Sequence, residues 1–128
     1  MNQDAAPRTP ADLEGRRRKA EQFALAAQAI HEVADGDSEL DDDYVTLCVH
    51  AGIAAADVIC MRRLDRYSRS KHHDDAAALL AQVDRALGKH LADLLGMKSR
   101  AGYSTLPVRA RDVTRAARAM QALIDAAR

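Results

Sequence analysis

The chain has 128 residues, enough for one domain with a hydrophobic core, and its formal net charge is zero. Hydrophobic residues form 48% of it and aromatic residues only 3%, so alanine and leucine carry most of the apolar content. This composition argues against a β-rich fold, because strands prefer β-branched and aromatic residues. The balanced charge excludes a strongly basic protein, so any binding of nucleic acid must come from a local patch.

Residues 1–9 are polar and contain alanine and proline, which predicts a disordered tail. The first helix is predicted to begin at Thr9-Pro10, where Thr9 can cap the helix and Pro10 suits its first position. Gly36 is expected to end this helix. Between these points, apolar residues recur at helical spacing on one face: Leu13, Ala20, Phe23, Ala27, Ile30 and Ala34.

Residues 35–43 hold six acids and no base, which predicts a loop. Residues 44–64 predict a second helix that is apolar on nearly every side, and such a helix belongs at the centre of a bundle. Gly52 in its interior costs about 1 kcal/mol relative to alanine. We therefore expect a neighbouring helix to approach closely at Gly52.

Residues 65–73 form a basic connection. A third helix is predicted over residues 73–95, where leucine and valine repeat at helical spacing, and Gly96 is expected to end it. Residues 97–107 contain breakers and are expected to be irregular or to form a short extra helical turn. A last helix is predicted over residues 108–127.

Helices joined by short links predict an all-α fold. We expect an antiparallel four-helix bundle, with a fifth helix as an alternative, that forms a single domain over residues 10–128.

Cys48 and Cys60 lie in one predicted helix, about 18 Å apart along its axis, which is too far for a disulfide. We expect two buried, reduced thiols. The polar N-terminus does not resemble a signal peptide, and no segment has the uninterrupted apolar length of a membrane span. The prediction is a cytoplasmic protein without a membrane partner.

Residues 66–73 contain the first group that could carry chemistry: Arg66, Arg69, His72 and His73. A histidine can act as general base or acid in RNA cleavage without a metal, and an arginine can stabilise the charged phosphate in the transition state. The alternative, which we favour, is a short basic loop whose histidines are solvated.

His72, His73, Asp74 and Asp75 are also metal-ligand types. Consecutive residues at a helix start point in different directions, whereas metal sites bring their ligands together. We favour Asp74 and Asp75 as residues that begin the third helix, and we expect no metal and no cofactor.

His50 and Asp57 lie two turns apart on one side of the central helix. A carboxylate in such an apolar run needs a partner, or its pKa rises. The candidate partners are His73, Lys98 and Tyr103. This set predicts either a ligand site or a structural polar cluster, and the structural reading is the more common of the two.

Basic residues gather in three places: residues 16–19 form a basic run near the start, Arg62 and Arg63 precede the basic connection, and Arg111, Arg115 and Arg118 share one face of the last helix. Such patches predict an anionic partner, either RNA or an acidic protein face. The alternative is a solvated face, which the scarcity of aromatic residues for stacking favours.

Three stretches together resemble the HEPN domains of bacterial defence and toxin systems. Residues 44–60 resemble the alanine-rich second helix of that family. Residues 71–80 resemble the start of its next helix, which opens with a histidine. Residues 94–103 resemble its segment of a leucine pair, a base and then Ala-x-Tyr. The resemblance implies a helical bundle, a homodimer, and a nucleotidyltransferase-type antitoxin as a possible protein partner.

HEPN ribonucleases carry an arginine followed a few residues later by a histidine, and they pair two such motifs across a dimer. In that family the motif typically lies near the helix that follows the middle of the domain. The best match here, Arg66 with His72 or His73, falls between the second and third predicted helices. Arg85 and His90 are a secondary match. The resemblance therefore favours a non-catalytic interaction domain in a defence or toxin–antitoxin system. A metal-independent ribonuclease and a nucleotide-binding bundle are the alternatives.

Overall fold

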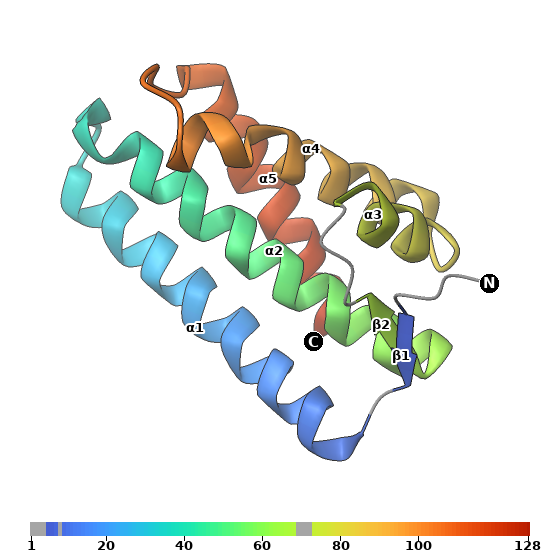
Figure 1. Cartoon of the computed structure of the whole chain (residues 1–128). Coiled ribbons are helices and arrows are strands. Elements are labelled where there is room, and N and C mark those ends of the chain that lie inside the picture. Colours follow the sequence, from blue (N-terminus) through green and yellow to red (C-terminus); the bar gives the residue numbers. More distant parts are fainter. Residues whose placement is uncertain (1–4, 8, 69–72) are drawn as a thin grey trace.

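The computed structural model describes residues 5–7, 9–68 and 73–128, and Figure 1 shows its helices packed into one bundle. The fold is all-α, with five α-helices, one 3₁₀ turn and one pair of short strands in the described residues. The elements in chain order are β1 (Ala5–Pro7), α1 (Pro10–Ala34), η1 (Ser38–Leu40), α2 (Asp41–Leu64), β2 (Arg66–Ser68), α3 (His73–Ala81), α4 (Arg85–Gly102) and α5 (Ala110–Ala127).

The start of α1 is as the sequence predicts. Thr9 Oγ1 accepts a hydrogen bond from the Asp12 backbone at 3.1 Å, and Asp12 Oδ2 accepts one from the Thr9 backbone at 3.2 Å. This reciprocal capping satisfies two backbone donors that the helix itself leaves unpaired. The helix ends at Ala34, and Asp35 takes the left-handed conformation directly after it.

Helix α2 is the central helix, as predicted, with α1 on one side and α4 and α5 on the others (Figure 1). Its alanines and valines are almost fully buried. A Cβ built on Gly52 would lie 2.3 Å from Leu94 Cδ1 of α4 and 3.3 Å from Leu123 Cδ1 of α5. The expected close approach at Gly52 is therefore confirmed.

The prediction of one helix over residues 73–95 is wrong. The chain forms two helices there, α3 and α4, separated by a turn at residues 82–84. Asp84 breaks the run, since its carboxylate accepts a hydrogen bond from the Leu87 backbone at 3.1 Å and caps α4. The two helices then fold against each other. A Cβ on Gly88 would lie 2.9 Å from Ala81 Cα, so only a glycine permits this approach.

The predicted helix end at Gly96 is also wrong. Helix α4 continues through Gly96, where the surroundings are open, and ends at Gly102. Helix α5 begins at Ala110, two residues later than predicted. The preceding loop is held by a hydrogen bond of 2.8 Å from the Val108 backbone to Asp42 Oδ1 at the start of α2.

The prediction of a disordered tail over residues 1–9 is wrong for residues 5–7. They form β1, which pairs antiparallel with β2, so that Ala5 lies opposite Ser68 and Pro7 opposite Arg66. The strand partner lies about 60 residues away in the chain, so no local pattern of residues predicts the pairing.

One helical segment, Ser38–Leu64, is long and apolar enough by composition to cross a membrane, and 72% of its most apolar window is buried inside the bundle. The central helix of a helical bundle meets the same criteria of length and composition.

Candidate functional site

One side of α2 combines polar and apolar side chains that are only partly buried. His50, Ile53 and Asp57 lie along this side at helical spacing, and their neighbours come from α1 and α4. Between Tyr44 and Met61, the other residues of α2 are mostly buried and apolar. This polar side of α2 is the first candidate site.

Asp57 is held by an arginine of α1. Arg16 Nε donates a hydrogen bond of 2.8 Å to Asp57 Oδ2, and the Asp57 side chain is only 15% exposed. Burial raises the pKa of Asp57 to about 6, although the positive charge and the hydrogen bond of Arg16 act in the opposite direction. The pair joins two helices across 41 positions of the chain.

His50 packs against an aromatic ring of α1. Its ring lies 5.2 Å from the ring of Phe23 at an interplanar angle of 28°, which is a stacked arrangement. Burial lowers the pKa of His50, and the positive charges of Lys98 and Arg16 lower it further. The neutral imidazole is therefore the favoured form in the folded protein.

The predicted polar cluster of His50, Asp57, His73, Lys98 and Tyr103 is only partly assembled. Lys98 of α4 lies near enough to influence His50. Tyr103 is 81% exposed, and it follows Gly102, which lies beside Thr46 rather than Asp57. Thr46 and Asp57 are separated by about 16 Å along the axis of α2. The side chain of His73 lies outside the described residues.

Arg16, the partner of Asp57, is not among the candidates predicted from the sequence. A signal was present, because Arg16, Ala20, Phe23 and Ala27 follow one another at helical spacing on the face of α1 that packs on α2. An arginine at the end of an apolar face can bury its stem and offer its charge to a neighbouring helix.

The predicted catalytic group is described only in part. Arg66 lies in β2, is half-buried, and donates a hydrogen bond of 3.5 Å to Gln82 Oε1. Arg69 and His72 lie outside the described residues, and His73 is described only as the first residue of α3. Among residues 5–7, 9–68 and 73–128, no three potential metal ligands come together.

The secondary pair, Arg85 and His90, does not converge on one surface. Both residues lie on α4, but a separation of five residues turns them roughly 140° apart around the helix. His90 is half-buried between α4 and α5, whereas Arg85 is exposed at the first position of α4. Lys89 and Arg118 are the basic neighbours that share the surroundings of His90.

A groove along α4 and α5 gathers basic side chains. It consists of two adjoining hollows that share Asp93 and Arg115. The basic residues that line it are Lys89, His90, Arg100, Arg109, Arg115 and Arg118. Of the predicted anion-binding residues of α5, Arg115 and Arg118 line this groove, while Arg111 is exposed outside it. Arg115 is partly neutralised by Asp93 at 3.3 Å and Asp112 at 3.8 Å.

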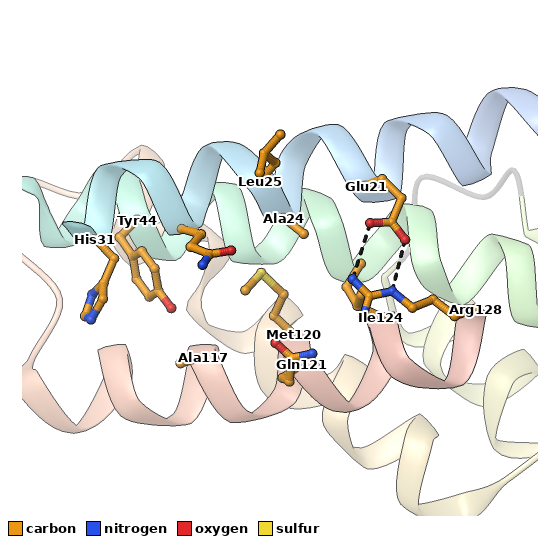
Figure 2. A pocket seen from close by; sticks show the side chains of 11 residues that line it. Glu21, Ala24, Leu25, His31, Tyr44, Ala117, Met120, Gln121, Ile124 and Arg128 are labelled. Carbon is orange, nitrogen blue, oxygen red and sulfur yellow. Dashed lines mark hydrogen bonds and ion pairs between the residues drawn. The ribbon is translucent and has the colours of Figure 1, made fainter. Parts of the chain in front are cut away.

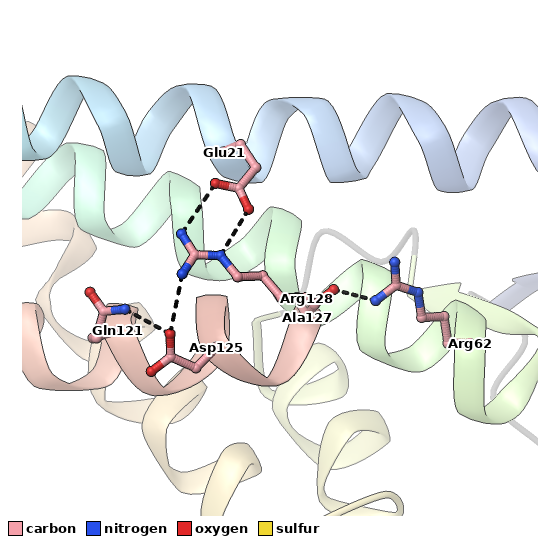
Figure 3. Close-up of polar contacts among 6 residues, drawn as sticks. All are labelled: Glu21, Arg62, Gln121, Asp125, Ala127 and Arg128. Atoms are coloured by element: carbon pink, nitrogen blue, oxygen red, sulfur yellow. Dashed lines mark hydrogen bonds and ion pairs between the residues drawn. The ribbon is translucent and has the colours of Figure 1, made fainter.

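Arg62 and Arg63 lie away from the α4–α5 groove. They line a small cavity of about 180 Å³ between the end of α2 and the start of α4. Arg62 donates a hydrogen bond to the carbonyl oxygen of Ala127, as Figure 3 shows. This bond satisfies a carbonyl at the end of α5, so Arg62 has a structural role there.

A second groove runs between α1 and α5 and has a volume of about 270 Å³ (Figure 2). Its apolar lining comes from Ala24, Leu25, Ala117, Met120 and Ile124. His31 and Tyr44 lie at one end of the groove in Figure 2, with their rings 5.2 Å apart.

The other end of the α1–α5 groove is closed by charged residues (Figure 3). Arg128 Nε lies 3.2 Å from Glu21 Oε1, and Arg128 Nη1 lies 3.5 Å from Asp125 Oδ1. Because Glu21 belongs to α1 and Arg128 follows α5, these contacts tie the two helices together where the groove ends.

The two cysteines do not take part in any of these surfaces. Both are buried and unpaired, and burial raises the pKa of each thiol to about 12. A thiol with so high a pKa is a poor nucleophile, because the thiolate is the reactive form.

The chain matches no protein-family model, no curated protein and no solved structure. The likeness to HEPN domains is therefore a resemblance carried by residues 44–60, 71–80 and 94–103 alone.

Proposed function

We propose that this chain is a non-catalytic helical interaction domain, similar to HEPN domains, that assembles as a homodimer in the cytoplasm. The observation that carries the proposal is the incomplete covering of α1. Only Ala20 and Ala27 of this 25-residue helix are buried, while Leu25 is 69% exposed and Val33 is 77% exposed. Leu25 also lines the apolar groove between α1 and α5, and an exposed apolar side chain that continues into an apolar groove is typical of a surface that binds another protein.

The contacts of the polar side chains support the same function. Asp57 is engaged by Arg16, and His50 is stacked on Phe23. Both contacts join α1 to α2, so these groups fix where the outer helix meets the bundle. The buried, unpaired cysteines fit the reducing environment of the cytoplasm.

Sedimentation equilibrium of the whole chain tests the proposal. At about 10 µM we expect a weight-average mass at least midway between those of the monomer and the dimer, which corresponds to an association free energy of roughly −7 kcal/mol or stronger. A monomer mass throughout a series that reaches about 200 µM would contradict it.

A second candidate function is the binding of a polyanion such as RNA in the α4–α5 groove. Lys89, Arg100, Arg109, Arg115 and Arg118 outnumber the acids of that groove, Asp93 and Asp112. Phosphate groups bind such a groove with an affinity that falls as salt rises.

Fluorescence anisotropy with a labelled single-stranded RNA at several salt concentrations measures this binding. We expect Arg118→Glu to weaken binding and to reduce the salt slope by about one. Arg111→Glu is the matched control, because Arg111 is exposed on the same helix but does not line the groove. Equal salt slopes for the two variants and the unmodified chain would exclude the groove as the binding site.

A further inference from the structure

The outward side of α1 carries a regular row of exposed residues. Arg18, Gln22, Leu25, Ala29 and Glu32 follow one another at steps of four, three, four and three, and all five are exposed. This spacing places them along one line of the helix surface. We name these five residues the α1 stripe.

The charges of the α1 stripe are arranged symmetrically about Leu25. Arg18 lies seven residues before Leu25, and Glu32 lies seven residues after it. If two such helices cross antiparallel with a twofold axis at Leu25, Arg18 of each copy faces Glu32 of the other. A twofold interface requires a surface that is complementary to itself in this way.

We propose that a second copy of this chain docks on the α1 stripe, with the two α1 helices antiparallel and Leu25 at the twofold axis. This proposal rests on the homodimer proposed above and assigns its interface. In this pairing the two Leu25 side chains, each 69% exposed in the single chain, cover one another. The same contact covers the rim of the α1–α5 groove, which Leu25 helps to line (Figure 2).

Charge favours a second copy over an acidic or a basic partner. The α1 stripe carries one positive and one negative residue, so it has no net charge. A strongly acidic or basic partner would be repelled by one of the two, whereas an antiparallel copy pairs both. The formal net charge of the whole chain is zero, so long-range repulsion between copies is also absent.

Helix α1 supplies part of the area that a stable contact needs. Its 25 residues extend over about 38 Å with a diameter of about 10–12 Å, which offers roughly 400 Å² of surface, whereas an interface of standard size needs roughly 800 Å² from each partner. The neighbouring groove adds apolar surface from Ala24 and the α5 side chains at the centre of the contact.

Charge reversal tests the pairing. We expect Arg18→Glu alone, and Glu32→Arg alone, to raise the dimer dissociation constant about tenfold or more, because each variant creates two like-charged contacts across the axis. The double variant with both changes restores opposite charges, and its dissociation constant should return to within about threefold of the original. Arg111→Glu, an exposed reversal on α5, should have no effect.

A cross-linking experiment gives a second readout that does not depend on charge. With diamide as the oxidant, Leu25→Cys should form a disulfide-linked dimer, because residue 25 of both copies lies at the axis. Val33→Cys, which is equally exposed, should remain unlinked, because the two copies of residue 33 would be about 24 Å apart. The native cysteines are buried and should not interfere.

The outcomes separate this inference from the proposed function. If the chain dimerises but the single reversals do not weaken the dimer, or the double variant does not restore it, the α1 stripe is not the interface. The proposed homodimer is not contradicted by that result. A strictly monomeric chain overturns both. Circular dichroism at 222 nm checks that every variant is folded, and all the substituted positions are exposed.

Discussion

Arg16 of α1 and Asp57 of α2 form an ion pair at 2.8 Å, although 41 positions separate them in the chain. Together with the stacking of Phe23 on His50, this pair provides specific contacts for a helix that buries few apolar residues. Helix α1 is thus held to the bundle by polar and aromatic contacts as well as by packing, while its outward side stays available.

The burial of Asp57 predicts how stability depends on pH. The pKa of Asp57 is raised from 3.8 to about 6, so the folded state holds its proton more tightly than the unfolded state. The stabilisation from this group is complete below about pH 4 and is lost as the pH rises through about 6.

We expect Asp57→Asn, which imitates the protonated acid, to be more stable than the unmodified chain at pH 7 by roughly 1–3 kcal/mol. The difference in unfolding free energy between the two proteins should disappear near pH 4. Urea unfolding of both proteins between pH 4 and pH 7 measures this difference in stability. A difference that stays constant over this range would contradict the assignment.

His50 predicts a pH dependence of the opposite sign. Burial, Lys98 and Arg16 lower its pKa below 6.5, so the unfolded state takes up the proton more readily than the folded state. Stability from this group is therefore lost as the pH falls below about 6.5. Replacing His50 by Gln in an Asp57→Asn background should flatten the remaining slope. An NMR titration that places the His50 pKa above 6.5 would refute this prediction.

Two glycines in helix interiors predict opposite effects of the same substitution. Gly52→Ala would place a Cβ against Leu94 and Leu123 in the core, so we expect a loss of about 1–3 kcal/mol. Gly96→Ala meets nothing within 4 Å and should add about 0.5–1 kcal/mol through helix propensity. Thermal unfolding of both variants measures the two effects, and a Gly52→Ala protein of unchanged stability would show that the core is looser than described.

A ribonuclease assay tests the alternative that the HEPN resemblance raises. In the presence of a chelator we expect single-stranded RNA to remain intact, because the proposed function is non-catalytic. Variants His73→Ala and His90→Ala, which remove a histidine from each candidate motif, should behave in the same way. Cleavage by the unmodified chain that either variant abolishes would replace the interaction domain by a metal-independent ribonuclease.

Much of the helical architecture was predictable because its signals are local. Thr9 and Pro10 mark the start of α1, and a surface that is apolar on nearly every side marks α2 as the central helix. The division of residues 73–95 into α3 and α4 was not predicted, because the apolar repeat continues across the turn at residues 82–84. Asp84, which caps α4, resembles any exposed acid until the folding of α3 against α4 is known.

The candidate sites were less predictable, because they depend on residues that meet only in the folded chain. His50 and Asp57 were recognised as polar residues in an apolar helix, but Arg16 was found only as the observed neighbour of Asp57. The basic residues of α5 were recognised as one face, whereas the contribution of Lys89 and His90 from α4 was not.

Local signals in the amino-acid sequence are enough to predict an all-α protein, the starts of α1 and α3 and the identity of the central helix, because apolar periodicity and capping act over a few residues. The folded arrangement was needed to show which charges meet, where residues 73–95 turn back, and that Leu25 faces outward on α1. These features depend on contacts between distant segments, and no local pattern of residues specifies such contacts.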